Sequence, residues 1–559
     1  MALVAACAME AGVATASTPQ TPYTVTRISA PDPQPGGRWG ERLASAGDEN
    51  GDGVPDFFVG EPQYTNGPLT KAGRVYLMSG KTLKPLYRID SPEPQAGAKF
   101  GFFIQVLGDV NHDGKNDIAI GTDAQTVGPN VGQGKAWVFE GATGKLLYEL
   151  NDPNPQPRAR FGSRIGRAGD ITGDGVPDVI VGASNSDIPT GCSAVSPLPA
   201  GCHKNQGQAY IFNGANGQLV RTLDLPTEDQ VPGTCLKKCG TFGLAVQSPG
   251  DVDGDGVPDQ LVDAGTANGT VGRMYVFSGK TGQVIRKIDD PTPQPGVNFG
   301  FQDVAPLTPG DINHDGHADL FGNGFGQSGP AGMNQGRAWL FDGRTGAVLH
   351  ELKDPNPQQG GGFAFSAAMT DYNKDGTPDI YVGKAPHDNP PFEDGGTYVF
   401  DGKTGNLLKR LELPPGDGQT GTDANGGPSL GFSDAAPGDL NHDGQPDYLA
   451  GAPFRDAPLL DEGQVYLFTS VDRTRPTRPH VSGRRRTSSG RVVFRLSSRD
   501  VDNPLGELRF RCAFDHHGLR PCGRRVIKRL SAGRHVFRVQ AQDVKGNHSP
   551  VTRVKLVVR

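Results

Sequence analysis

The chain has 559 residues, enough for more than one domain, and no apolar run reaches membrane-spanning length. Gly (81) and Pro (47) are abundant but recur with a period of roughly 60 residues, which indicates turns in a repeat array and excludes a disordered chain. The net charge of −6 is uneven, because residues from 475 onward carry 21 Lys/Arg against 5 Asp/Glu, which leaves 34 Lys/Arg and 56 Asp/Glu for the rest.

The first segment, residues 1–20, is predicted to be a poor or truncated signal sequence. Met1 to Ser17 is apolar and ends in Ala14-Thr15-Ala16, a cleavage-like pattern, but it lacks a basic start and Glu10 interrupts it. Val4-Ala5-Ala6-Cys7 is similar to a bacterial lipobox, so a lipid anchor is an alternative. Both patterns predict export, and the expected location is secreted or cell-surface.

The pattern D-x-N-x-D-G-x-x-D, with Asp or Thr in some copies at the third position, occurs seven times. The copies begin at Asp48, Asp109, Asp170, Asp251, Asp311, Asp371 and Asp439. Short oxygen-bearing side chains at alternate positions of a turning loop converge on one point, which is the arrangement that Ca²⁺ prefers. An EF-hand would need Glu at position twelve, where this chain has Val59, Ile120, Val181, Val262, Gly322, Val382 and Ala450. Each loop is therefore predicted to lead into a strand, and up to seven Ca²⁺ ions are expected.

In each copy the first, third, fifth and ninth residues are predicted to supply side-chain oxygens, and the seventh a backbone carbonyl. The predicted ligands are Asp48, Asn50, Asp52, Val54 and Asp56; Asp109, Asn111, Asp113, Lys115 and Asp117; Asp170, Thr172, Asp174, Val176 and Asp178; Asp251, Asp253, Asp255, Val257 and Asp259; Asp311, Asn313, Asp315, His317 and Asp319; Asp371, Asn373, Asp375, Thr377 and Asp379; and Asp439, Asn441, Asp443, Gln445 and Asp447. Thr172 departs most from the pattern.

Each repeat contains four short strand patterns. An aromatic-Gly pair such as Phe100-Gly101 precedes the metal loop, and an apolar run such as Val179-Ile180-Val181-Gly182 follows it. A variable loop leads to a third strand such as Arg337–Phe341, and a turn such as Ser278-Gly279-Lys280-Thr281-Gly282 leads to a fourth. That turn is not a phosphate-binding loop, because the required upstream glycine is absent. Four strands per repeat predict one β-propeller blade.

These motifs resemble the FG-GAP repeats of integrin α-subunits and their bacterial relatives. Trp39-Gly40 and Phe161-Gly162 stand for the FG pair, and Val59-Gly60-Glu61-Pro62 and Ala450-Gly451-Ala452-Pro453 for GAP. The resemblance covers residues 21–470 and implies an all-β, seven-bladed propeller with Ca²⁺ between the first two strands of each blade. Repeats six and seven depart, with Phe363-Ala364 and Leu430-Gly431.

The seventh repeat ends after Val465-Tyr466-Leu467-Phe468 without a fourth strand. Residues 23–29, followed by a Pro-rich segment like those after other fourth strands, match what is missing. The N-terminal strand is therefore predicted to complete the last blade and close the ring. Strand parity then places the metal loops on one face and the variable loops, with the Asp-Pro-x-Pro-Gln linkers, on the other. The variable face is the expected site for a protein or glycan ligand.

Six of the seven cysteines form close pairs: Cys192 with Cys202, Cys235 with Cys239, and Cys512 with Cys522. The spacing predicts disulfides in an oxidising compartment. After a linker at 471–485, residues 486–559 alternate apolar and Arg positions. This pattern is similar to small Ig-like or fibronectin-like β-sandwiches, and its positive charge predicts attraction to an anionic cell-surface polymer or to the acidic propeller.

No catalytic motif is present. The predicted function is that of a calcium-binding adhesion or binding module without enzymatic activity, and no nucleic-acid partner is expected. Two alternatives stay open. One is an extracellular polysaccharide lyase or hydrolase that uses loop residues such as Tyr64, His203, Asp388, Arg455 and Asp456. The other is a purely structural surface protein.

Overall fold

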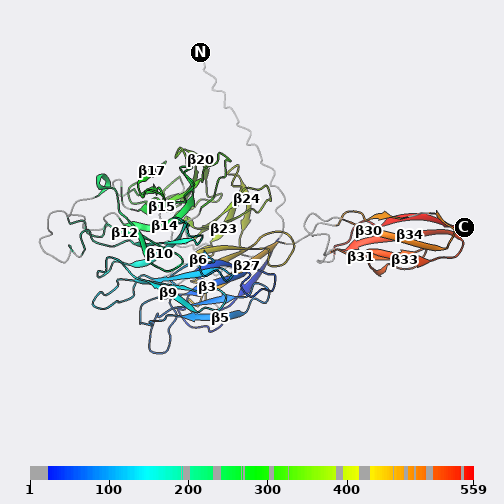
Figure 1. Cartoon of the computed structure of the whole chain (residues 1–559), viewed down its shortest axis with the longest axis horizontal. Helices are drawn as coiled ribbons and strands as arrows, with labels where there is room; N and C mark the ends of the chain where they lie inside the picture. Colours follow the sequence, from blue (N-terminus) through cyan, green and yellow to red (C-terminus); the bar gives the residue numbers. More distant parts are fainter. Residues whose placement is uncertain are drawn as a thin grey trace, which may run out of the picture.

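The computed structural model describes residues 23–190, 192, 202–230, 241–265, 267, 271–300, 308–324, 326–330, 332–385, 395–413, 429–456, 459–470, 476–483, 486–498, 508–542 and 547–559. Strands supply nearly all of their regular structure (Figure 1), and Thr227–Asp229 form a short 3-10 turn. The all-β prediction is confirmed. Within these residues, no helix is long and apolar enough to cross a bilayer.

The described part of the repeat region forms seven antiparallel sheets, six with four strands and one with three. The first strands are β2 (Arg42–Gly47), β6 (Phe103–Gly108), β10 (Phe161–Gly169), β14 (Phe242–Gly250), β21 (Phe363–Thr370) and β25 (Ser433–Gly438). Six of the second strands begin at the ninth residue of a metal loop: β3 (Asp56–Glu61), β7 (Asp117–Thr122), β11 (Asp178–Ala183), β15 (Asp259–Ala264), β22 (Asp379–Lys384) and β26 (Asp447–Ala452). The seventh, β18 (Leu320–Gly324), begins one residue later. In the fifth sheet, the residues before the loop (301–307) lie outside the described residues.

The third and fourth strands form a hairpin in each of the first six sheets. The third strands are β4 (Arg74–Met78), β8 (Lys135–Phe139), β12 (Gln208–Phe212), β16 (Arg273–Phe277), β19 (Arg337–Phe341), β23 (Gly396–Phe400) and β27 (Gln464–Ser470). The fourth strands are β5 (Pro85–Asp90), β9 (Leu146–Leu150), β13 (Leu219–Leu223), β17 (Val284–Asp289), β20 (Val348–Leu352) and β24 (Leu407–Leu411). The second strands are buried on both faces, which explains their unbroken apolar runs.

The seventh sheet takes its fourth strand from the other end of the repeat region. Strand β1 (Tyr23–Ile28) pairs antiparallel with β27, with Tyr23 opposite Ser470 and Ile28 opposite Val465. The predicted closing strand is therefore confirmed.

Neighbouring sheets are joined by backbone hydrogen bonds beside the aromatic-Gly pairs. These bonds run from Trp39 N to Glu462 O (2.7 Å), Phe100 N to Ala72 O (2.8 Å), Phe161 N to Gln133 O (2.7 Å), Phe242 N to Gln206 O (2.8 Å), Phe299 N to Val271 O (2.8 Å), Phe363 N to Gln335 O (3.0 Å) and Gly396 N to Leu430 O (3.0 Å). The first of them joins the last sheet to the first, so the sheets form a closed ring. The β-propeller prediction is confirmed.

The core lies between the sheets, and a separate apolar cluster fills each junction. Two signature glycines meet at most junctions. A Cβ on Gly182 would lie 2.0 Å from the carbonyl oxygen of Gly243 in the next sheet, so the backbones touch there. Between the fifth and sixth sheets both glycines are replaced, and the Asn323 amide donates to Ala364 O (2.7 Å) instead. The side-chain hydrogen bond compensates for the missing backbone contact.

The C-terminal residues form two further sheets with a common apolar core that includes Phe494, Phe537 and Val539. One sheet has the order β28-β30-β33 and the other β29-β35-β34-β31-β32. Their bounds are β28 (His480–Ser482), β29 (Arg486–Thr487), β30 (Arg491–Ser497), β31 (Arg509–Phe514), β32 (Arg520–Cys522), β33 (Arg525–Arg529), β34 (Gly533–Gln542) and β35 (Thr552–Val558). This is a β-sandwich, as predicted; its assignment as Ig-like stays a prediction.

Candidate metal loops and the opposite loop face

The seven predicted metal loops share one backbone conformation. The glycine at position six has a positive φ in every copy, as at Gly256 (+86°), where L residues with a side chain are strained. Position four is also left-handed, and there the chain uses Gly51, Gly173 and Gly254 but also His112, His314, Lys374 and His442. The left-handed residues at positions four and six bend the loop back on itself and turn its acidic side chains inward.

The inward-turned oxygens accept hydrogen bonds from the loop's own amides. In the fourth copy, Asp251 accepts from Asp255 N (3.1 Å) and Gly256 N (2.9 Å), Asp253 from Asp255 N (3.1 Å), and Asp255 from Val257 N (3.0 Å). Two of these bonds recur in all seven copies. The first-position carboxylate accepts from the fifth-position amide, and the fifth-position carboxylate accepts from the seventh-position amide. The loop's own amides therefore orient its carboxylates.

The ninth-position aspartate ties each loop to the rest of its sheet. Asp259 is fully buried and accepts from Val252 N (2.7 Å) and Asp253 N (3.2 Å) in its loop, and from Gly279 N (2.9 Å) in the turn between β16 and β17. In five other sheets the ninth-position aspartate also accepts from the glycine amide of this turn. The pairs are Asp56 with Gly80, Asp117 with Gly141, Asp178 with Gly214, Asp319 with Gly343 and Asp379 with Gly402. The seventh sheet has no such turn, and Asp447 accepts from Leu440 N and Asn441 N.

The same contact explains the glycine of the repeated Gly-Lys-Thr-Gly turn. A Cβ on Gly279 would lie 1.9 Å from the carbonyl oxygen of Pro258, at position eight of the loop, and Gly80 would meet Pro55 O at the same distance. Only glycine fits against that carbonyl. The turn is a hairpin, as predicted, and it also packs against the metal loop.

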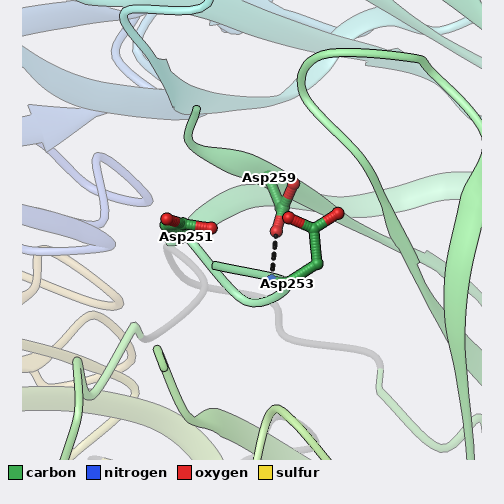
Figure 2. Close-up of side chains that lie close together, drawn as sticks. All are labelled: Asp251, Asp253 and Asp259. Atoms are coloured by element: carbon green, nitrogen blue, oxygen red, sulfur yellow. Dashed lines mark hydrogen bonds between the residues drawn. The ribbon is translucent and has the colours of Figure 1, made fainter. Parts of the chain in front are cut away.

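In the fourth loop, oxygens of Asp251, Asp253 and Asp259 lie within 4.8 Å of one another (Figure 2). Burial raises the pKa of Asp259 to about 6, although amide hydrogen bonds from Gly279 and Val252 oppose the shift, and the neighbouring Asp253 charge adds to it. Burial likewise raises the pKa of Asp447 to about 7, with repulsion from Asp443 next. A cluster of hard oxygens, with one carboxylate that is costly to ionise, suits a divalent cation that restores its charge.

The third loop differs, as its sequence predicted. Thr172 Oγ1 lies 3.4 Å from Asp178 Oδ1. In the other six loops the fifth-position amide donates to the third-position side chain, as Asp255 N does to Asp253, and no such bond joins Asp174 N to Thr172. Its single hydroxyl replaces the amide or carboxylate oxygen that every other copy has at position three. This loop therefore offers one strong oxygen fewer.

On the opposite face, the Gln of the interstrand linkers clamps the variable loops. Gln95 Nε2 donates to Thr126 O (2.8 Å) and its Oε1 accepts from Thr126 N (3.1 Å). The equivalent pairs are Gln34 with Thr65, Gln156 with Asp187, and Gln294 with Ser328. Sequence reasoning missed this clamp, although the regular distance from each Gln to its partner was a usable signal. Loops held in this way form a rigid surface.

Disulfides Cys192–Cys202 and Cys512–Cys522 are present as predicted. The Cys235 and Cys239 pair lies outside the described residues. Cys192–Cys202 closes the long variable loop of the third sheet, where Ile188 and His203 also pair through their backbones. The loop is therefore cross-linked on the variable face.

Three variable loops expose a large apolar side chain three residues before the glycine that precedes the third strand. Val131 is 65% exposed, Met333 63% and Leu460 58%. Exposed apolar residues on an otherwise polar surface cost solvation free energy that a bound partner can recover.

The described residues named for an enzyme contact neighbours in their own sheet or loop. Tyr64 stacks on Arg74, whose guanidinium carbon lies 3.1 Å from the ring centroid, and Asp456 accepts from Asp461 N (2.9 Å) within its own loop. Arg455 lies over Tyr466, and Asp388 is outside the described residues.

Comparison with known proteins agrees with this geometry. The FG-GAP repeat model matches residues 39–78, 100–139 and 161–212, and an FG-GAP-like repeat model matches 311–382. The chain is 32% identical to integrin alpha-PS5 of Drosophila melanogaster over 154 residues, 25% of this chain and 14% of the relative. It is 29% identical to integrin alpha-V of Gallus gallus over 226 residues (39% and 19%), and 37% identical to integrin alpha-IIb of Homo sapiens over 166 residues (26% and 15%). The matches thus span less than a fifth of these relatives.

Proposed function

We propose that this FG-GAP, integrin α-like β-propeller is an extracellular binding or adhesion module whose ligand lies on the variable-loop face. The observation that carries the proposal is the combination of loops clamped by Gln95 and its equivalents with the exposed side chains of Val131, Met333 and Leu460. A pre-organised surface with apolar side chains loses little conformational entropy when it binds. The integrin names of the relatives support adhesion.

Calcium is proposed as the structural cofactor, with up to seven ions in the seven loops. The support is the cluster of Asp251, Asp253 and Asp259 oxygens in the fourth loop, the shared backbone conformation of the seven loops, and the raised pKa of Asp259, which an ion would reverse. We also propose the division into a propeller at 21–470, a linker at 471–485 and an Ig-like sandwich at 486–559. An extracellular location is supported by the disulfides Cys192–Cys202 and Cys512–Cys522.

The test is a binding screen of the calcium-loaded chain on glycan and extracellular-protein arrays. Binding should be lost in the triple variant V131D/M333D/L460D. The matched control is L86D/V348D/L407D, which places the same charges on outer strands at residues that are 41%, 44% and 36% exposed. The control should bind like the wild type.

Equal loss in both variants would overturn the assignment of the face. Release of soluble sugar fragments from a bound glycan would instead support the polysaccharide-acting enzyme. Failure to bind any array in calcium would leave the purely structural role as the better account.

A further inference from the structure

The described residues of the C-terminal sandwich carry almost no negative charge. Its described residues (476–483, 486–498, 508–542 and 547–559) include 14 Arg and 2 Lys, and Asp515 is their one carboxylate. Asp515 is already paired with His535 Nδ1 at 2.8 Å. The positive charge is therefore not balanced within the described part of the sandwich.

Four arginines lie on the outer face of the three-stranded sheet, on the paired strands β30 and β33. Arg491 lies opposite Arg529, and Arg495 opposite Arg525. Alternate residues of β30, Val492, Phe494 and Leu496, lie in the core, so the arginines point outward. We call Arg491, Arg495, Arg525 and Arg529 the arginine face.

Like charges directly opposite each other across antiparallel strands repel. All four side chains are exposed, and the described residues offer none of them a hydrogen bond or an ion pair. On the outer face of the other sheet, Arg511 donates to Leu519 O (3.3 Å) and Arg538 to His517 O, whereas the exposed side chains of Arg509, Arg534, Arg553 and Lys555 have no partner among the described residues. The arginine face therefore keeps its guanidinium groups available to an external anion.

The spacing indicates a polymer. The two arginine pairs are four residues apart along the strand, so their backbone positions are separated by about 13 Å at about 3.3 Å per residue. Val493 and Ile527, which pair between them, form an apolar step, and Ile527 is 46% exposed. Guanidinium groups bind carboxylates with two parallel hydrogen bonds, and the apolar face of a sugar can pack on the step. Proteins that bind single-stranded nucleic acid stack bases on exposed aromatic rings, but Phe494, Phe510 and Phe537 are buried.

We propose that the arginine face binds a carboxylate-bearing polysaccharide. This inference does not depend on the ligand of the propeller. It predicts that the full-length chain binds polygalacturonate at low ionic strength with an affinity that falls steeply with salt, and binds neutral dextran not at all.

The decisive comparison uses two variants with the same change in charge. R491Q/R495Q/R525Q/R529Q removes the arginine face, and R509Q/R534Q/R553Q/K555Q removes four charges from the outer face of the five-stranded sheet. We expect the first to lose at least about tenfold in affinity for polygalacturonate at 50 mM salt and the second less than about threefold. The first variant should also be no less stable than the wild type in thermal unfolding, because it removes like-charge pairs.

Equal losses in the two variants would overturn the proposal, because the binding would then follow net charge alone. Unchanged binding in the first variant would overturn it as well and would assign the polysaccharide to the propeller, leaving its proposed function intact. Double-stranded DNA or phosphatidylglycerol vesicles can be tested as competitors for the bound polygalacturonate. If either displaced it at a tenfold lower concentration of negative charge, the face would prefer a different class of polyanion, and the proposal would be wrong.

Discussion

Replacing Asp259 by Ala should destabilise the propeller more than replacing Asp251 by Ala, even when no calcium is present. Both residues are proposed ligands of one ion, and both accept three amide hydrogen bonds. The difference is burial. The bonds of Asp259 to Val252 and Gly279 are shielded from water, whereas the bonds of Asp251 to Gly254 and Gly256 are exposed.

The expected magnitude follows from which amides lose an acceptor. A buried amide without a partner costs about 1–3 kcal/mol, whereas water replaces the acceptor of an exposed one. D259A leaves two buried amides unpaired, so its free energy of unfolding in EGTA should fall by about 2–6 kcal/mol. D251A in EGTA should lose about 1 kcal/mol or less.

The assay is equilibrium unfolding in urea, followed by circular dichroism, of both variants and the wild type in EGTA and in millimolar Ca²⁺. In calcium, both variants should show a further loss of similar size, because each removes a ligand from the same site. If the two variants were equally stable in EGTA, the buried tie between the metal loop and the turn at Gly279 would have no energetic role. The reasoning about the ninth position would then be wrong.

Three further predictions can be tested on the wild type or on simple variants. Chelation by EGTA should lower the melting temperature of the whole chain by tens of degrees, since seven sites of about 10⁻⁴ M affinity in millimolar Ca²⁺ contribute on the order of 10 kcal/mol; an unchanged melting curve would contradict it. Deletion of residues 21–30 should remove β1 and destabilise the ring, whereas deletion of 1–18 should not; equal melting temperatures would contradict the closing role of β1. Burial raises the pKa of Glu61 to about 9, while Arg74 opposes the shift, so the folded state holds a proton that the unfolded state releases above pH 4.5. Wild-type stability should therefore fall as pH rises from about 5 to 9 by up to about 1.4 kcal/mol per unit, and E61Q should lack that slope; parallel pH profiles would refute it.

The sequence predicted what depends on the repeat itself. The loops, the strands that follow them and the pairing of β1 with β27 all follow from aligning the copies, since the missing strand of the last copy and the extra strand at residues 23–29 match. The disulfides followed from spacing. These features are local or are fixed by counting strands.

Other features depend on which atoms meet in space, and the repeat did not show them. The sequence motif predicted Asp259 as a metal ligand only. Its hydrogen bond from Gly279 joins two motifs, the metal loop and the hairpin turn, that are separate in the sequence. The replacement of both junction glycines by Asn323 and Ala364 looked like decay of the repeat, yet the two residues compensate through a hydrogen bond. The pairing of arginines across β30 and β33 required the strand register, which alternation alone does not give.

The pairing of β1 with β27 also constrains the order of events while the protein is being made. Thr24 and Thr469, which lie side by side in the last sheet, are 445 positions apart. A contact at that separation carries a large entropic cost unless the sheets between already bring the ends together. Strand β1 leaves the ribosome long before β27, so it has to wait unpaired until the seventh repeat has been synthesised. Any factor that protects the nascent chain has to cover that edge for the whole of this interval.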